Sequence, residues 1–183
     1  MPSNDLYQDK YRVASTRWAG YDYSQNGIYF ITICTQSRQP HFGEIQQGSQ
    51  LGDEAFLRPT AVAQRAIECW HAIPQHFPFA EPDAFVVMPD HVHGILFFHK
   101  SDAEPVQRST FGPQRQNLAS VVRGFKVGVK VWATQQQMPF AWQSGYFDRV
   151  IRNEEELEKA RRYLADNPNA WLRDKDKPDS IFR

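Results

Sequence analysis

Two histidines one residue apart form the clearest candidate for a chemical site in the sequence. His91 and His93 follow Met88-Pro89-Asp90 and lead into an apolar stretch typical of a β-strand. Side chains at positions i and i+2 of a strand point to the same face, so both imidazoles are expected on one side of a sheet. Two neutral imidazoles held in this way can bind one divalent metal ion. A pair of ordinary half-exposed histidines remains the alternative, because the motif is short.

The residue types around this pair favour an open metal site over a closed zinc site. There is no third His or Cys close to His91 and His93 to complete a tetrahedral zinc site. Oxygen ligands from another part of the chain, from water and from a substrate would complete the coordination instead, and such a site suits Mg²⁺ or Mn²⁺. The predicted cofactor is therefore Mg²⁺ or Mn²⁺.

A tyrosine and an asparagine near the C-terminus can supply what the histidines lack. Tyr163 and Asn167 are four residues apart, so on a helix they lie one above the other on a single face. Tyr163 can then act as a nucleophile, and the Asn167 amide oxygen as a third metal ligand. Because a tyrosine hydroxyl has a pKa of about 10, it would need help from a metal-polarised phosphate or a nearby base. The alternative for Tyr163 is simple packing, and Tyr146 is a weaker candidate nucleophile.

The order of predicted elements indicates the fold that positions these residues. Strands are expected at 27–35, 84–88, 91–99 and 146–151, and helices at 60–73, 118–132 and 153–167. The segment 40–59 is expected to lack regular structure, and Pro168 to end the last helix. The β-α-β-β-α-β order predicts an α+β, ferredoxin-like split βαβ fold, a four-stranded antiparallel sheet with two helices. The extra C-terminal helix carries the tyrosine.

The domain prediction is one domain at 27–173, between an N-terminal arm at 1–26 and a charged tail at 174–183. The chain has 183 residues, of which 41% are hydrophobic and 23% charged, which is enough apolar material for a core. No apolar run is long enough for a membrane span and the N-terminus lacks a signal peptide, so we expect no membrane contact and a cytoplasmic location.

Charge is distributed unevenly along the chain. The net charge is +0, but residues 106–152 hold seven basic residues against Asp148 alone. On the predicted helix at 118–132 three of these bases share one face, which is either a solvated surface or a surface for a polyanion. In the arm, Trp18, Tyr21 and Tyr23 either stack on unpaired bases or pack against the sheet. The predicted DNA-binding residues are Arg12, Arg17, Arg115, Arg123, Lys126, Lys130, Arg149 and Arg152.

Taken together, these motifs resemble the single-tyrosine HUH transposases, and most closely the REP-associated tyrosine transposase branch, over residues 12–173. The His-Val-His core alone is weak, but combined with Tyr-x-x-x-Asn-Pro on the terminal helix it is specific. Asp90 departs from many relatives, which have Asn there, and it either orients a histidine or caps a turn. The matching segments include 20–24, 27–35, 87–94, 111–114, 121–126, 142–143, 147–157 and 162–168.

The resemblance implies a metal-dependent cleavage and transfer of single-stranded DNA at REP-like hairpins, without a nucleotide cofactor. His91 and His93 would hold the metal, Asn167 would complete its coordination, and Tyr163 would form a covalent 5′-phosphotyrosine. Related transposases include dimers and monomers, so either state is expected. Two other functions stay open: a domesticated protein that binds DNA hairpins without cutting them, and a metallohydrolase of small substrates with Asp90 or Glu156 as base.

Overall fold

The central element of the fold is a four-stranded antiparallel sheet with the strand order β4-β5-β1-β6. The computed structural model describes residues 22–48, 54–100 and 116–173. This strand order is that of the predicted ferredoxin-like fold, so the predicted fold class is confirmed. The predicted charged tail at 174–183 lies outside the described residues, and so do five of the candidate DNA-binding or stacking residues: Arg12, Arg17, Trp18, Tyr21 and Arg115. The strands are β1 (Gly27–Cys34), β4 (Ala80–Met88), β5 (His91–Phe98) and β6 (Phe147–Ile151).

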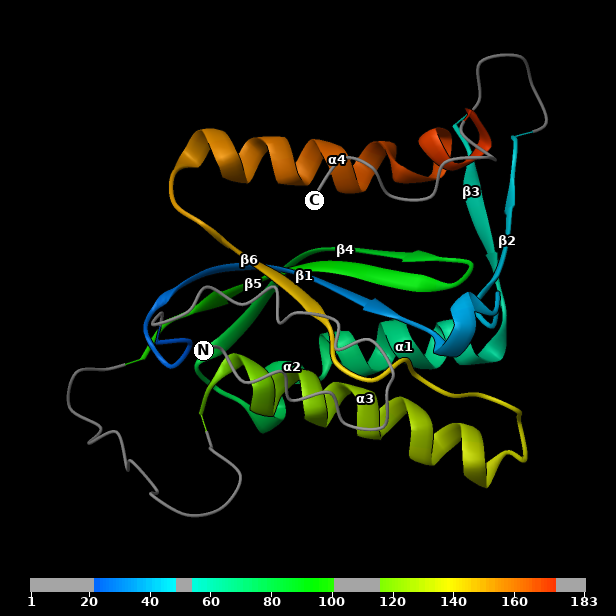
Figure 1. The fold of residues 1–183 in the computed structure, drawn as a ribbon, viewed down its shortest axis with the longest axis horizontal. Helices are drawn as coiled ribbons and strands as arrows, with labels where there is room; N and C mark the ends of the chain where they lie inside the picture. The colour runs from blue at the N-terminus through cyan, green and yellow to red at the C-terminus, as the bar shows by residue number, and fades with distance from the viewer. Residues whose placement is uncertain (1–21, 49–53, 101–115, 174–183) are drawn as a thin grey trace, which may run out of the picture.

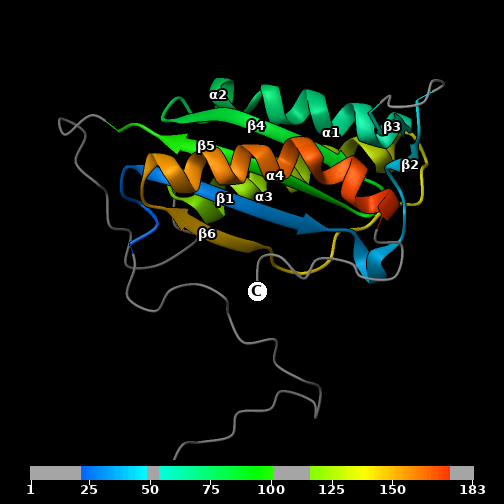
Figure 2. The ribbon, with the colours of Figure 1, turned by 90° about the horizontal axis from the view of Figure 1, so that it is seen from above.

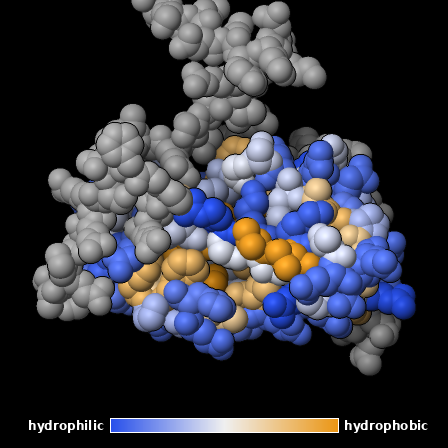
Figure 3. Space-filling view, turned by 90° about the horizontal axis from the view of Figure 1, so that it is seen from below, coloured by the Kyte–Doolittle hydropathy of each residue, from blue (hydrophilic) through white to orange (hydrophobic). Residues whose placement is uncertain are grey.

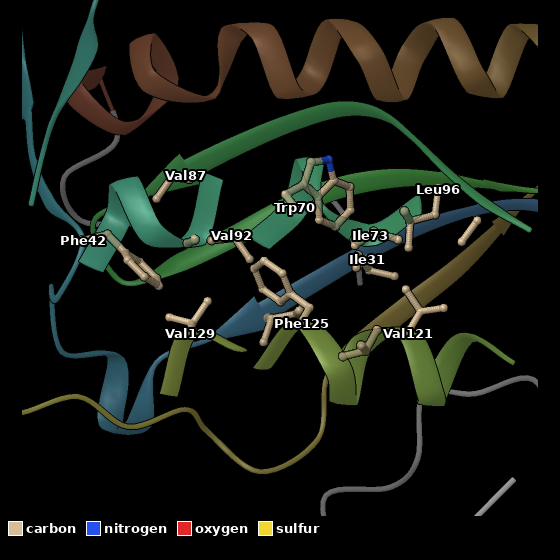
Figure 4. Packing of buried hydrophobic residues seen from close by; sticks show 14 of the residues in the cluster. Ile31, Phe42, Trp70, Ile73, Val87, Val92, Leu96, Val121, Phe125 and Val129 are labelled. Carbon is tan, nitrogen blue, oxygen red and sulfur yellow. The ribbon is translucent and has the colours of Figure 1, made fainter. Parts of the chain in front are cut away.

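One face of the sheet is covered by α1 (Ala61–His71), the short α2 (Ile73–His76) and α3 (Leu118–Gln135) (Figure 1). Alternate strand residues point to this face and meet apolar side chains of the helices. Trp70 is fully buried in the cluster and stacks on the Phe85 ring at 4.4 Å. Figure 4 shows this packing around Ile31, Phe42, Trp70, Ile73, Val87, Val92, Leu96, Val121, Phe125 and Val129.

The opposite face of the sheet is covered by a single helix, α4 (Glu154–Arg173) (Figure 1). Its first turn is capped, because the Asn153 side chain accepts a hydrogen bond from the Glu156 N–H at 2.9 Å. Arg161 binds both carboxylate oxygens of Asp83 at 2.9 and 3.1 Å and so ties the helix to β4. The apolar cluster beneath α4 is small: Phe30, Ile95, Ile151, Leu157, Ala160 and Leu164.

Pro168 does not end the last helix, contrary to the prediction. It lies inside α4, which continues to Arg173. A proline here removes the hydrogen bond to the carbonyl four residues earlier, but contacts beyond it hold the final turns in place. The Asn169 side chain accepts a hydrogen bond from the Ala55 N–H at 2.8 Å, and the Trp171 ring lies 6.0 Å from the ring of His91.

The segment 40–59 is also more regular than predicted. It forms a two-stranded antiparallel sheet of β2 (Gly43–Gln46) and β3 (Phe56–Pro59), which lies beside the C-terminal end of α4 (Figures 1 and 2). Gly43 has a φ of 134°, and a Cβ there would lie 2.1 Å from the Arg58 carbonyl oxygen. Short strands interrupted by glycines lack the long alternation by which a sheet is predicted, so the prediction failed here.

Among the described residues, no helix combines the length and the apolar character that a membrane span requires. Figure 3 shows the molecule from the side of α1 and α3, where a small apolar patch lies among hydrophilic residues. The exposed apolar side chains of α3 are Val127 and Val131.

Candidate active site

The two histidines of the motif lie side by side beneath α4. They alternate along β5 with Val92 and Gly94, whose positions face the opposite side of the sheet. Both imidazoles are buried, with exposed fractions of 0% for His91 and 3% for His93. Their Nε2 atoms lie 3.0 Å apart. The prediction that both rings project to one face is therefore confirmed.

The outer nitrogen of His91 is held by the neighbouring aspartate. His91 Nδ1 lies 2.6 Å from Asp90 Oδ1, and the second carboxylate oxygen of Asp90 accepts from Arg38 Nε at 2.8 Å. The backbone carbonyl of Asp90 accepts from the Thr35 N–H and hydroxyl, both at 2.9 Å. An ionised carboxylate can only accept, so beside it a neutral His91 carries its proton on Nδ1 and presents a lone pair at Nε2. Asp90 therefore orients a histidine, which decides between the two roles left open by the sequence.

The outer nitrogen of His93 is held by a hydroxyl. Thr32, its partner across β1 and β5, places Oγ1 2.7 Å from His93 Nδ1. A threonine hydroxyl can donate or accept, so it fits either tautomer of the imidazole. When the hydroxyl donates, His93 Nε2–H can donate to His91 Nε2. When it accepts from Nδ1–H, both Nε2 lone pairs face each other and are ready for one cation.

Burial keeps His93 neutral. Its pKa lies well below the ordinary value of 6.5, first because burial penalises the charged ring, and then because His91 and Arg38 repel a positive charge. Protonated imidazole cannot bind a metal, so a depressed pKa keeps the lone pair available at neutral pH.

Three side chains of α4 line the space above the histidines. Tyr163, Asn167 and Trp171 are spaced by four residues and so form one stripe along the helix. The Tyr163 ring lies 5.4 Å from the His93 ring, and the Trp171 ring 6.0 Å from the His91 ring. Asn167, between these two contacts, is buried with an exposed fraction of 6%. Asn167 therefore lies on α4 between the two residues whose rings contact the histidine pair.

The two facing imidazoles are nitrogen donors that could share one divalent cation. Their Nε2 atoms lie 3.0 Å apart, which is also the distance of a hydrogen bond between a protonated and an unprotonated ring nitrogen. Within the described residues no group of three His, Cys, Asp or Glu side chains could hold a metal, so any third protein ligand here would be another type of side chain, such as an amide.

The predicted bases of α3 lie on the other side of the sheet from the histidines. Lys126 Nζ donates to the carbonyls of Gln143 and Gly145 at 2.8 and 2.9 Å, and Lys130 Nζ donates to that of Phe140 at 2.5 Å. Burial lowers the pKa of Lys126. These ammonium groups tie α3 to the segment that leads into β6. The structure does not bring them, or Arg123 on the same helix, to the histidine pair.

The remaining described candidates divide between the two faces. Arg149 on β6 pairs in register with Phe30, which packs under α4, so it shares the histidines' face and lies 3.6 Å from Glu156. The Arg152 N–H donates to Glu156 at 3.1 Å where the chain enters α4. Tyr146 and Tyr23 pack against the apolar cluster on the other face.

Three site residues were not identified from the sequence: Thr32, Arg38 and Trp171. Thr32 could have been found by pairing the first predicted strand with the histidine strand, since both expose alternate residues to one face. Trp171 continues the Tyr163–Asn167 spacing but lies beyond Pro168. Arg38 gives no local signal, because it reaches Asp90 from a separate turn, the short 3₁₀ helix Gln36–Arg38.

Comparison with known proteins gives a relative in sequence and a neighbour in structure. No family model matches the sequence. The chain is 36% identical over 170 residues to an uncharacterized protein from Haemophilus influenzae, covering 87% of this chain and 90% of that protein. The two proteins belong to one family. The matched region covers most of both proteins.

The structural neighbour gives the fold a precedent. The chain is similar to a REP-associated tyrosine transposase solved bound to a REP hairpin, with a TM-score of 0.55 and 21% identity. The similarity covers 91% of this chain and 82% of that one. The protein therefore has the same fold as this transposase, as the resemblance in sequence implies.

Proposed function

We propose that the protein is a metal-dependent DNA transposase that cleaves and rejoins single strands through Tyr163. The observation that carries this proposal is the contact of the half-buried Tyr163 ring with the buried His93 ring within a single chain, with Asn167 buried one turn further along α4. A fold shared with a REP-associated tyrosine transposase supports it. A structural protein has no need to bury two facing imidazole nitrogens beneath a tyrosine.

In the proposed reaction, Tyr163 Oη attacks the phosphorus of a phosphodiester. Oη loses its proton as its bond to phosphorus forms, the bond to the 3′ oxygen breaks, and that oxygen leaves with the electron pair and takes up one proton, so no net proton is gained or lost. The product is a 5′-phosphotyrosine, which a second 3′-hydroxyl can attack to restore a phosphodiester. Because the ester bond energy is retained, no nucleotide cofactor is needed.

His91, His93 and Asn167 would hold Mg²⁺ or Mn²⁺, which when bound supplies charge stabilisation for the phosphate oxygens. Asp90 and Thr32 fix the two rings, and such outer contacts keep metal ligands oriented. Phe30 lies 6.1 Å from the Tyr163 ring and 5.4 Å from the His93 ring, so it holds the nucleophile against the histidine. These residues position the tyrosine before any substrate enters.

The proposed substrate is single-stranded DNA next to a REP-like hairpin. The neighbour in structure was solved with a REP hairpin, and Arg149 and Arg152 provide positive charge near the start of α4 on this chain. The other proposed DNA contacts fall into two groups. Three of them lie on α3, away from the histidine pair: Arg123, Lys126 and Lys130. Three lie outside the described residues: Arg12, Arg17 and Arg115.

The metallohydrolase alternative has little support in the geometry. It needs a general base free to activate water, yet Asp90 is engaged by His91 and Arg38, and Glu156 by the Arg152 N–H and Arg149. A protein that only binds hairpins does not need Tyr163 as a nucleophile. An assay for a covalent adduct distinguishes such a protein from a transposase.

The deciding experiment is an adduct assay with hairpin oligonucleotides that carry single-stranded flanks and are taken from DNA beside the gene. We expect wild type with Mn²⁺ to give a denaturant-resistant protein–DNA adduct, and Tyr163→Phe or chelation by EDTA to abolish it. Tyr146→Phe is the matched control and should leave the adduct intact. Equal adduct from Tyr163→Phe would refute the proposed nucleophile, and tight hairpin binding without any adduct would favour the binding protein.

Because Tyr163 meets His93 within one chain, we propose that the tyrosine acts in its own subunit. A mixture of Tyr163→Phe and His91→Ala proteins then has no intact site, and we expect no adduct from it. Adduct formation by the mixture would instead indicate that the helix is exchanged between two subunits.

A further inference from the structure

We propose that Phe147 on β6 is a stacking platform for one base of the DNA strand beside the scissile phosphate. This inference rests on the proposed function and adds a residue that binds the strand rather than the phosphate. It starts from an exposed aromatic ring on a sheet edge, close to the buried histidines.

The sheet register places Phe147 in one cross-strand row with the site. Thr32 on β1 pairs with His93 on one side and with Phe147 on the other. Residues paired directly across antiparallel strands point to the same face, so Phe147 lies on the α4 side. Two strand spacings of about 4.8 Å separate it from His93, about 10 Å in all. That is two or three nucleotides at the roughly 3.4 Å spacing of stacked DNA.

The Phe147 side chain is the most exposed member of its cross-strand row. Phe147 has an exposed fraction of 41%, whereas His93 in the same row is buried. Figure 2 shows why, because β6 forms the edge of the sheet and emerges beside α4 rather than beneath it. A strand of DNA that reaches the histidines from this edge would pass over β6.

The next residue on the same face of β6 adds a positive charge. Arg149, two positions along the strand, has a side chain that is 54% exposed and lies 3.6 Å from Glu156. An exposed aromatic ring next to a cation is the arrangement by which single-stranded nucleic acids are bound without sequence readout: the ring stacks on a base and the cation faces the backbone. The geometry therefore assigns Phe147 to a base and Arg149 to an adjacent phosphate.

The test compares binding of oligothymidine with binding of an abasic oligomer of the same length and charge, both measured in the Tyr163→Phe background to prevent covalent chemistry. Stacking on one base predicts that Phe147→Ala weakens oligothymidine binding about tenfold. Phe147→Trp should restore it, and Phe147→Leu, which keeps the apolar bulk but not the ring, should not. Val131→Ala on α3 removes an exposed apolar side chain from the other face and should have no effect.

The abasic oligomer separates stacking from a structural role. With no base to stack, it should bind the Tyr163→Phe protein equally well with and without Phe147→Ala. Equal weakening of both oligomers by Phe147→Ala, or no weakening of either, would overturn the inference, as would failure of the Tyr163→Phe protein to bind oligothymidine. The adduct assay is scored separately: a Tyr163 adduct without any base preference at Phe147 overturns only this inference, and a base preference without an adduct overturns only the proposed strand transfer.

Discussion

The two faces of the sheet bury different kinds of side chain. The face toward α1 and α3 buries a large, almost purely apolar cluster, which includes Trp70 and Phe42. The face toward α4 has a much smaller apolar cluster and buries Asp90, His91, His93 and Asn167 beside it. Apolar burial is the main favourable term in folding, so the first face supplies most of the stability.

The second face holds polar side chains in place by hydrogen bonds rather than by packing. The contacts of Asp90 to His91, of Thr32 to His93 and of Arg38 to Asp90 satisfy groups that would otherwise be costly to bury. Side chains on alternate positions of one strand, β5, therefore belong to the apolar core on one side and to the proposed active site on the other. Substitutions at neighbouring positions should separate the two.

The largest expected difference is between two tryptophans. Trp70→Ala removes a fully buried ring and should lower the free energy of unfolding by about 3–5 kcal/mol. Trp171→Ala removes a half-buried ring near His91, so its cost should be about 1–2 kcal/mol, with a clear loss of Mn²⁺ affinity. Urea unfolding and calorimetric Mn²⁺ titration measure both, and equal stability losses would contradict the contrast between faces.

A substitution at Gly94, inside the histidine motif, tests the packing of the face toward α1 and α3. A Cβ at this position would lie 2.3 Å from the Trp70 ring, so Gly94→Ala should cost about 1–3 kcal/mol through overpacking. The methyl group points away from α4, and the folded fraction should therefore bind Mn²⁺ as wild type does. Weaker binding with unchanged stability would show that the two faces are coupled through the strand.

Substitutions of Asp90 test whether the polar contacts on the face toward α4 orient His91 for metal binding. Asp90→Ala removes the acceptor for His91 Nδ1 and should weaken Mn²⁺ binding about 10- to 100-fold. Asp90→Asn keeps an acceptor oxygen and should recover most of that loss. If both variants bind Mn²⁺ as wild type does, the carboxylate does not orient the ligand.

The smallest effect is expected at the ion pair that ties α4 to β4. Arg161 lowers the pKa of Asp83, chiefly by hydrogen bonding to it. A depressed carboxyl pKa stabilises the fold above the unfolded value of 3.8, and this contribution is lost as the pH falls through the folded value. Both side chains are partly exposed, so Arg161→Gln should cost no more than about 1 kcal/mol near neutral pH.

The same variant makes a pH prediction. The stability difference between wild type and Arg161→Gln should stay constant from neutral pH down to about pH 5 and shrink below about pH 4. Arg65→Gln is the matched control, because Arg65 pairs with Glu68 only within α1 at 2.9 Å and should matter less. A difference that grows on acidification would contradict the assigned sign.

Much of the architecture follows from local sequence patterns. The β-branched and aromatic residues of 27–35 and the apolar body of 91–99 predicted two strands that the structure confirms, and the helical spacing from Leu118 predicted α3. The errors at 40–59 and at Pro168 have a common cause. In both places non-local contacts, such as the bond between Ala55 and Asn169, stabilise structure that the local sequence disfavours.

The sequence by itself determined which side chains share a face: His91 with His93 at a spacing of two, and Tyr163 with Asn167 at a spacing of four. Only the tertiary structure decided that these two pairs meet, that Thr32, Arg38 and Trp171 join them, and that the bases of α3 lie across the sheet. The reason is physical. Backbone periodicity fixes the direction of a side chain within its own element, whereas strand register and the choice of the face that a helix covers depend on contacts between residues far apart in the chain.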